Sequence, residues 1–339
     1  MATAVAAARR AGEEDLMPAL LITLAISIVL CGLYLKLARR LQIMDLPNER
    51  SSHTLPTPHG GGTAMLVAFS LGLAAAAWMG MAWHSQYLAL AGGALLLMLV
   101  GVVDDLRGLP VRLRFSFYAL CSVVLVSVLL KPHGGQWLVA LVAAFALLWM
   151  LNLYNFMDGI DGIAALQATI ACVGAAIISW FYAADLQYFF FCLLLAAAQL
   201  GFLCWNWPPA RMFMGDAGSV PTGFLVGGLA LLGAVEGTLP LACWLILLAV
   251  FVTDASYTLV ARMFAGERFT QPHRTHAYQR LSRHWGGHLP VDMLLLAINA
   301  LWLFPLALTT SLCPKFSFLL VILAYIPLLY GMAKARKVG

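Results

Sequence analysis

The chain has 339 residues, of which 62% are hydrophobic and only 10% are charged. Soluble domains carry about 25% charged residues, so this composition excludes an ordinary soluble enzyme, a disordered protein and a secreted disulfide scaffold. The net charge of +5 is small, and it points to orientation in a membrane and not to binding of nucleic acid.

Apolar runs long enough to cross a bilayer recur along the whole chain. They predict an all-α, polytopic integral membrane protein with about 11 transmembrane helices, at 17–38, 63–83, 86–103, 115–130, 136–154, 162–183, 186–205, 219–236, 239–261, 290–311 and 316–332. The first run is followed by basic residues and lacks a small-residue cleavage site, so it predicts a retained helix and not a signal peptide. We expect a single transmembrane domain over 1–339, with a short N-terminal tail at 1–16.

Lys and Arg are distributed unevenly between the two ends of these spans. If the N-terminus is outside, all of the 20 basic residues fall in the inner loops and the C-terminal tail, except Arg9, Arg10, Lys131 and Lys315. The positive-inside rule therefore predicts an outer N-terminus and a cytoplasmic C-terminus. The predicted cytoplasmic loops are also the longer and more polar ones, so we expect an active site built from cytoplasmic loops.

The first of these loops, 44–62, contains three prolines and ends in three consecutive glycines. Proline forbids a continuing helix, and glycine permits either a tight re-entry or the close approach of the backbone to a ligand. Arg50 and His53 in this loop are donors suited to phosphate. The alternative is an ordinary re-entry loop with positive-inside charge.

Two adjacent carboxylates, Asp104 and Asp105, end the third apolar run. At a membrane boundary such a pair is costly unless a cation, a proton or a function compensates it. The pair can bind Mg²⁺ or take a proton from a phosphate. Alternatively, both carboxylates are solvated and cap the end of the helix.

The stretch 152–162 has two Asp-Gly steps three residues apart, which predict a turn between two spans. Its side chains supply hard oxygen ligands, or donors and acceptors for a nucleobase edge, from Asn152, Asn155, Asp158 and Asp161. A polar turn alone would not require four such groups so close together, so we expect a functional role here.

The fourth loop contains Phe213, Gly215, Asp216 and Gly218 just before a Gly-rich span. Small residues let the backbone approach an anion, and the following helix offers its N-terminal N–H groups. Asp216 can complete a metal site. Gly-rich packing against a neighbouring helix is the competing interpretation.

The longest and most basic loop, 262–289, includes His273, Arg274 and His276. Its charge suits a diphosphate or an anionic lipid headgroup, and neither cysteine nor Glu completes a zinc site with the two histidines. The alternative is a solvated basic loop. Asp254 lies inside the preceding span, about 10 Å deep by helix rise, where a carboxylate should face the bundle or a cleft.

Together these loops gather carboxylates, amides, Arg and His on one predicted face. This combination fits metal-assisted phosphoryl transfer between a charged soluble donor and a lipid. An ion-coupled secondary transporter is the alternative from another class, but it should concentrate polar groups near the membrane midplane, where only Asp254 is expected.

Five motifs in order carry a resemblance to a known family: DLPNERSSHTLPTPHGGG, GVVDD, NLYNFMDGIDG, FMGDAGS and PHRTHAYQRL. They resemble the polyprenyl-phosphate N-acetylhexosamine-1-phosphate transferases, of the glycosyltransferase 4 type. The resemblance implies transfer of a sugar 1-phosphate from a UDP-N-acetylhexosamine to undecaprenyl phosphate, with release of UMP. It also implies Mg²⁺ or Mn²⁺ as cofactor and a place in the bacterial inner membrane, with the active site facing the cytoplasm. Whether the chain forms a homodimer stays open.

The residues and the resemblance together predict three sets of roles. Metal binding is expected at Asp216, with Asn155 beside it. Catalysis is expected of Asp104, Asp105, Asp158, Asp161 and His273. Substrate binding is expected of Arg50, His53, Asn152, Asn155, Phe213, Arg274 and His276.

The last motif departs from the peptidoglycan branch of that family, which carries consecutive histidines. The order His273-Arg274-Thr275-His276 is instead similar to the branch that initiates O-antigen. The resemblance therefore implies initiation of a lipid-linked surface glycan, as in lipopolysaccharide biosynthesis. A phospho-MurNAc-pentapeptide transferase is the alternative, and the residues do not choose among GlcNAc, FucNAc and QuiNAc donors.

Overall fold

The structure is a computed structural model that describes residues 2–47, 55–130, 137–266 and 274–337. Nine of the described helices are long and apolar enough to cross a membrane, and a bent pair of helices adds a tenth crossing if it counts as one span. The protein is therefore an all-α polytopic membrane protein, as the apolar runs predict. The count of 11 spans and the orientation in the membrane stay predictions.

The elements follow one another in simple order along the described chain. The first half contains α1 (Ala2–Arg40), β1 (Met44–Asp45), β2 (Thr57–Pro58), α2 (Gly62–Trp78), α3 (Ser85–Arg107), α4 (Val111–Leu130), α5 (Trp137–Phe156) and α6 (Ile163–Tyr182). The second half contains α7 (Leu186–Asn206), α8 (Asp216–Glu236), α9 (Leu241–Leu247), α10 (Ala249–Phe264), α11 (Ala277–His284), α12 (Leu289–Ile298), the π-helix η2 (Asn299–Leu303), α13 (Phe304–Leu312), the 3-10 turn η3 (Pro314–Phe316) and α14 (Ser317–Ala335).

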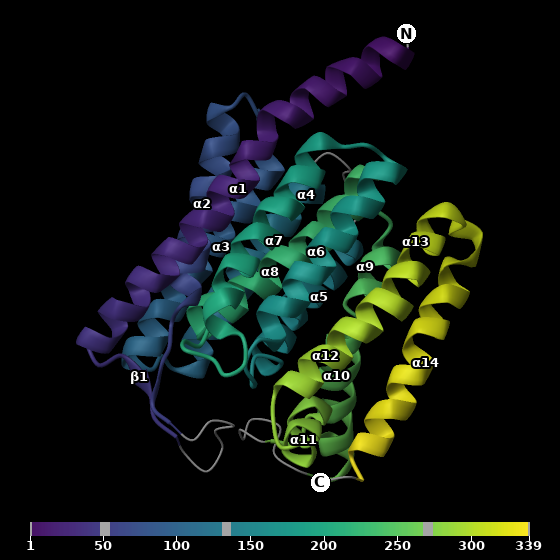
Figure 1. The fold of residues 1–339 in the computed structure, drawn as a ribbon. Helices are drawn as coiled ribbons and strands as arrows, with labels where there is room; N and C mark the ends of the chain where they lie inside the picture. Colours follow the sequence, from purple (N-terminus) through teal and green to yellow (C-terminus); the bar gives the residue numbers. More distant parts are fainter. Residues whose placement is uncertain (1, 48–54, 131–136, 267–273, 338–339) are drawn as a thin grey trace.

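Helix α8 lies at the centre of the bundle, with α1 and α14 at opposite margins (Figure 1). In the most apolar stretch of α8, 83% of the residues are buried, whereas the corresponding share is 11% in the span Pro314–Ala335, which contains α14. Helix α8 packs against α3 and α5, and its small residues allow this. A Cβ added at Gly62 on α2 would lie 2.2 Å from Cα of Gly218, so these two backbones are in direct contact.

Two predicted spans differ from the structure. The run 63–83 forms only the shorter helix α2, which ends at Trp78. The run 239–261 forms α9 and α10, which meet at a 73° bend. Neither Pro nor Gly marks the bend at Leu248, so the sequence does not reveal it. The packing partners change in part at the bend, because α9 packs on α13, α14 and α6 whereas α10 packs on α14 and α5, so that α14 contacts both helices.

Backbone pairings hold the loops together at one end of the bundle. Strands β1 and β2 pair antiparallel, with Met44 opposite Pro58. The Gly60–Gly62 stretch then pairs with the loop before α8, because the N–H of Gly61 donates to the carbonyl of Phe213 over 3.0 Å. These glycines therefore provide a tight re-entry and a close approach to another loop of the same chain.

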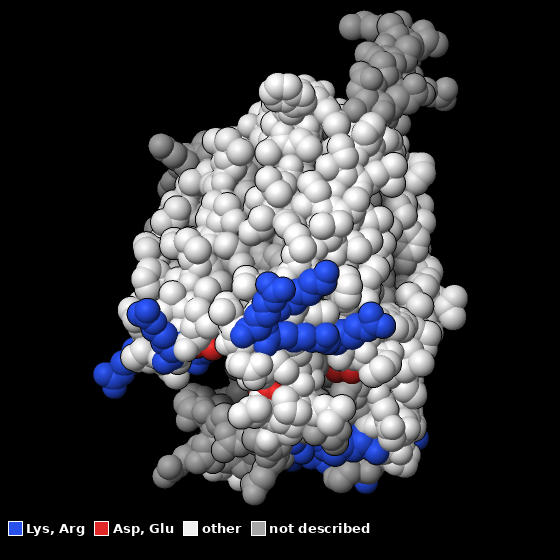
Figure 2. Space-filling view, turned by 60° about the vertical axis from the view of Figure 1, so that its left-hand side comes forward, with Lys and Arg blue, Asp and Glu red and all other residues white. Residues whose placement is uncertain are grey.

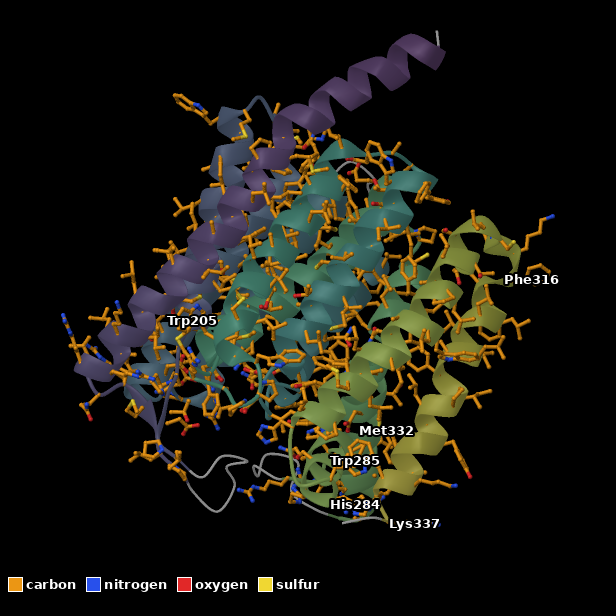
Figure 3. All side chains as sticks on the ribbon, in the orientation of Figure 1. Trp205, His284, Trp285, Phe316, Met332 and Lys337 are labelled. Atoms are coloured by element: carbon orange, nitrogen blue, oxygen red, sulfur yellow. The ribbon has the colours of Figure 1, made fainter. Side chains whose placement is uncertain are left out.

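Basic side chains gather at this same end, which we call the basic end and define by Arg39, Arg107, Arg114, Arg280 and Lys334. Figure 2 shows Lys and Arg side chains in the lower part of the molecular surface, whereas the described residues in the upper part of that face show no Lys or Arg. In Figure 3, His284 and Lys337 lie at this end, and Phe316, at the turn between α13 and α14, lies well above them.

Candidate active site

A cavity of about 520 Å³ opens at the basic end of the bundle. It lies between the last turn of α5, the turn 157–162 and the loop that leads into α8. Acidic and amide side chains dominate its polar lining, which comprises Asp45, His59, Asp105, Asn155, Asp158, Asp161, Asn206, Asp216, Ser219 and Gln279. The structure thus brings six predicted site residues together around one cavity: Asp105, Asn155, Asp158, Asp161, Phe213 and Asp216.

The N-terminus of α8 is capped by an acid from another helix. The Oδ1 of Asp105 accepts from the N–H of Asp216 at 3.2 Å, and its Oδ2 accepts from the N–H of Ala217 at 3.3 Å. The preceding Gly215 has φ +75, and a Cβ there would lie 2.7 Å from Oδ2 of Asp105. A non-glycine residue is disfavoured at that position on both grounds. The amides that the sequence predicts for an anion are therefore already used by Asp105.

Asp216 and Asn155 lie next to each other, as their predicted metal role requires. The Nδ2 of Asn155 is 2.8 Å from Oδ1 of Asp216 and 3.1 Å from Oγ of Ser219. Asn155 belongs to the last turn of α5, whereas Asp216 is the first residue of α8. Packing of α5 on α8 thus places the two oxygen-bearing side chains on one wall of the cavity.

Arg114, which contacts a cavity residue but does not itself line the cavity, was missed by the sequence interpretation. Its Nη1 donates to Oδ2 of Asp104 at 2.5 Å and to Oδ2 of Asp216 at 2.9 Å. Asp104 also accepts from the N–H of Leu109, so it braces the α3–α4 connection and does not line the cavity. The only sequence signal is that Arg114 is the third basic residue after the acidic pair, following Arg107 and Arg112, and positive-inside charge accounts for such a series.

Asp158 lies where several negative charges meet. Burial raises the pKa of its carboxyl well above the usual range, and the neighbouring charges of Asp216, Asp105 and Asp161 raise it further. A low-dielectric site that concentrates carboxylates in this way is stabilised by a cation or by a proton. The described residues offer no cluster of three His, Cys, Asp or Glu with the geometry of a metal site.

Asp161 lines the cavity and also joins two of the elements that surround it. Its Oδ2 accepts from the N–H of Ala210 at 2.9 Å and lies 3.1 Å from Nδ1 of His288, which precedes α12. Asn206 accepts from the N–H of Gly162 and donates to the carbonyl of Met212. The turn 157–162 and the loop before α8 are therefore joined side by side.

His276 faces away from the cavity, although substrate binding is predicted for it. It is 4% exposed, and its Nδ1 lies 3.3 Å from Oδ1 of Asp254 on α10. Asp254 also accepts from the N–H groups of Ala277 and Tyr278, so it caps α11 from a neighbouring helix. This confirms that Asp254 faces the bundle, and it shows that the predicted basic loop contains a docked helix.

Docking of α11 brings a further polar residue to the cavity. Gln279, the third residue of α11, lines the wall beside Gly159, and Tyr278 donates to the carbonyl of Phe156 at 2.9 Å. Gln279, together with Asp45, His59 and Asn206, was not singled out from the sequence. These residues have no distinctive spacing, and only the fold places them at one cavity.

The other predicted residues divide into two groups. Asn152 donates to the carbonyl of Leu148 in its own helix and does not line the cavity, and the backbone carbonyl of Arg274 accepts from Arg283. Arg50, His53 and His273 lie outside the described residues. Their predicted roles, like those of the cavity residues, stay predictions.

The fold and the cavity define a polytopic membrane protein with an acid-rich site at the basic end of a helical bundle. The model of glycosyl transferase family 4 matches residues 87–234. A probable undecaprenyl-phosphate N-acetylglucosaminyl 1-phosphate transferase of Bacillus subtilis is 24% identical over 275 residues, which are 78% of this chain and 76% of that protein.

Two further relatives extend the comparison. A decaprenyl-phosphate N-acetylglucosaminephosphotransferase of Mycolicibacterium smegmatis is 27% identical over 74% of this chain and 71% of its own length. A phospho-N-acetylmuramoyl-pentapeptide-transferase of Geobacillus thermodenitrificans is 27% identical over 66% of this chain and 77% of its own length. The chain is thus similar to glycosyl transferase family 4 over residues 87–234, and to these transferases over 66% to 78% of its length.

Proposed function

We propose that the protein transfers an N-acetylhexosamine 1-phosphate from a UDP-sugar to undecaprenyl phosphate and releases UMP. The observation that carries this proposal is the convergence of Asp105, Asn155, Asp158 and Asp216 on one cavity beside the cation Arg114. The cavity lies at one end of the membrane bundle, where a soluble nucleotide and a lipid phosphate can both arrive. The named relatives support the same reaction class.

The donor set at the cavity fits Mg²⁺ or Mn²⁺. Both ions prefer carboxylate and amide oxygens, and Asp216 and Asn155 supply these from adjacent helix ends. When bound, the metal supplies positive charge that offsets the charge of the diphosphate and of the departing UMP. The crowding of negative charge around Asp158 is consistent with such a cation.

The side chains of the chain itself serve mainly to position groups and to balance charge. Arg114, held by Asp104 and Asp216, presents a fixed cation toward the phosphate groups of the substrates. We propose direct in-line attack by the polyprenyl phosphate oxygen on the sugar-bound phosphorus. Asp105 and Asp158, which line the cavity, are the proposed acid–base or substrate-orienting groups, and Asp105 also caps α8 through both of its oxygens. A covalent adduct on Asp104 or Asp105 would contradict direct attack.

We further propose that the basic end faces the cytoplasm of a bacterial inner membrane, because basic side chains are concentrated there. The motif around His276 favours initiation of a surface glycan such as O-antigen. The peptidoglycan pentapeptide donor is the second candidate, since one relative carries that activity.

The test incubates the purified protein in nanodiscs with undecaprenyl phosphate, Mg²⁺ and a panel of UDP-N-acetylhexosamines, including UDP-MurNAc-pentapeptide. We expect UMP release with one donor, and none without undecaprenyl phosphate. The absence of UMP from every donor, together with substrate flux in liposomes, would support the ion-coupled transporter instead. The placement of the acids at one end of the bundle, away from its middle, argues against that alternative.

A further inference from the structure

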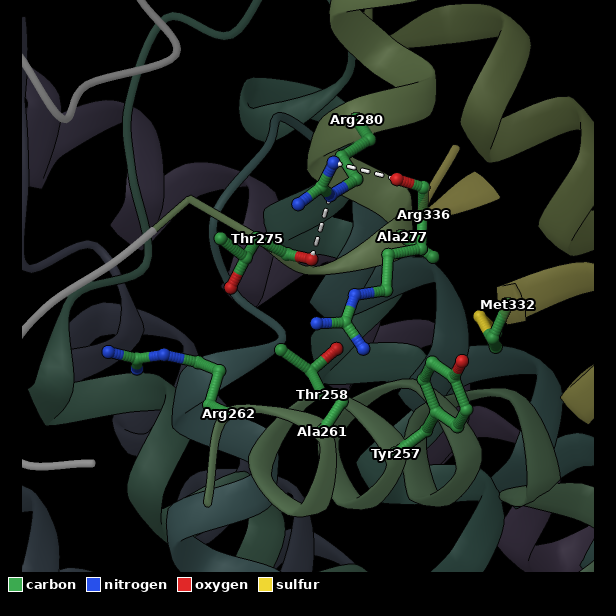
Figure 4. A pocket seen from close by; sticks show the side chains of 9 residues that line it. All are labelled: Tyr257, Thr258, Ala261, Arg262, Thr275, Ala277, Arg280, Met332 and Arg336. Atoms are coloured by element: carbon green, nitrogen blue, oxygen red, sulfur yellow. Dashed lines mark hydrogen bonds between the residues drawn. The ribbon is translucent and has the colours of Figure 1, made fainter. Parts of the chain in front are cut away.

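A second, smaller pocket lies between α10, α11 and the end of α14 (Figure 4). Its volume is about 40 Å³, and it shares no lining residue with the acid-rich cavity. Three arginines line it, Arg262, Arg280 and Arg336, together with the hydroxyl side chain of Thr258. A single buried water needs roughly 10–15 Å³, so this pocket has room for a group of the size of a phosphate.

Backbone carbonyls hold the side chain of Arg280 in the pocket wall. The Nε of Arg280 donates to the carbonyl of Thr275 at 3.2 Å, and its Nη1 donates to the carbonyl of Arg336 at 3.1 Å. The second bond ties α11 to the end of α14. In Figure 4 the side chain of Arg336 folds back from α14, so that its guanidinium lies over Thr258 on α10.

The surroundings of the pocket are positively charged. Among the described residues no carboxylate lines it, and Asp254, one turn before Thr258, is engaged with Thr258 and the start of α11. Burial lowers the pKa of Arg283 from its usual range, and the like charges of Arg280 and Arg274 lower it further. An anion is the ligand that this concentration of guanidinium groups favours.

Exposed apolar side chains occur on α10 and α14, two of the helices that supply pocket residues. Phe264 on α10 is 90% exposed, and Tyr330 on α14 is 63% exposed, as befits side chains that face lipid. The pocket also lies at the basic end, where the membrane surface is expected. A ligand that reaches it from the bilayer would therefore carry a negatively charged head and an apolar body.

We propose that this pocket binds a phosphate group between Arg336 and Arg280, presented by an anionic phospholipid or as free phosphate. The inference does not depend on the proposed transferase activity, because the pocket lies apart from the acid-rich cavity. Arg280 joins the pocket to α11, so a bound phosphate would also strengthen the contact between α11 and α14.

The experiment uses the full chain in detergent. Native mass spectrometry measures retention of added phosphatidylglycerol against phosphatidylcholine, and thermal unfolding is measured with and without inorganic phosphate at constant ionic strength. We expect the unmodified protein to retain phosphatidylglycerol preferentially. Arg336→Gln should reduce that retention about fivefold, since one arginine contributes about 1 kcal/mol at an anionic surface. Arg40→Gln, which removes an exposed charge at the end of α1, should leave retention unchanged.

Stabilisation by inorganic phosphate that Arg336→Gln abolishes, without preferential lipid retention, would identify free phosphate as the ligand. Equal retention of both lipids without phosphate stabilisation would overturn the proposal, as would retention by Arg336→Gln equal to that of the unmodified protein. Arg280→Gln also loses two backbone contacts and can fail to fold. Arg336, at the exposed end of α14, therefore provides the decisive variant.

Discussion

The Nη1 of Arg114 lies 2.9 Å from Oδ2 of Asp216, although 102 residues separate them in the sequence. The same nitrogen donates to Asp104, so one guanidinium joins α4 to the end of α3 and to the start of α8. This relationship places a permanent cation beside the carboxylate proposed to bind metal. It also makes the geometry of the acidic wall depend on a residue outside the acidic motifs.

Replacement of Arg114 should therefore impair turnover without unfolding the protein. We expect Arg114→Gln to lower kcat about 10²- to 10³-fold, the usual cost of removing one charge-stabilising donor, and Arg114→Lys to lose less. UMP release measures the effect, and size-exclusion chromatography checks folding. Arg112→Gln, two residues earlier on the exposed side of α4, is the matched control. Near-normal turnover of Arg114→Gln would remove Arg114 from the site.

Asp216→Asn should abolish metal-dependent turnover while the protein stays folded, because an amide is a weaker ligand for Mg²⁺ than a carboxylate. A titration of UMP release with Mg²⁺ measures this. Ser219→Ala removes only the hydroxyl near Asn155 and should cost about fivefold, typical of one hydrogen bond. An unchanged Mg²⁺ titration curve for Asp216→Asn would reject the metal role.

Asp254→Ala should release α11 from α10, because two backbone N–H groups lose their acceptor. Loss of a helix cap costs about 1–2 kcal/mol. Amide hydrogen exchange over 277–284 should accelerate, and turnover should fall as Gln279 leaves the cavity wall. Thr258→Val removes only a hydroxyl that donates to Asp254, so exchange should change little. Slow exchange over α11 in Asp254→Ala would contradict the capping role.

Gly62→Ala should destabilise the protein, because its Cβ would lie 2.2 Å from Cα of Gly218 and force α2 and α8 apart. Overpacking of this kind costs about 1–3 kcal/mol, and a thermal melt in detergent measures it. Gly92→Ala is the control, since a Cβ at Gly92 meets nothing within 4 Å. It should be neutral or slightly stabilising. Equal melting temperatures for the two variants would show that the α2–α8 contact tolerates separation.

Sequence patterns identify the main acidic residues of the cavity, but they do not tell which histidines line it. Asp105, Asp158 and Asp216 were identified because paired or turn-associated carboxylates are unusual beside apolar runs, and all three line the cavity. His276 has the same kind of signal, but it faces Asp254 and not the cavity. Residue type and spacing do not distinguish a histidine that binds substrate from one that packs beneath a helix.

The sequence by itself determined the membrane class, the all-α fold and the approximate position of most spans. The reason is that a bilayer requires long apolar helices, and this requirement is local in the chain. Only the tertiary structure decided the pairing of Arg114 with Asp216, the capping of α8 by Asp105 and the bend at Leu248. Each of these depends on which helices pack together, and helix packing joins residues that no local pattern connects.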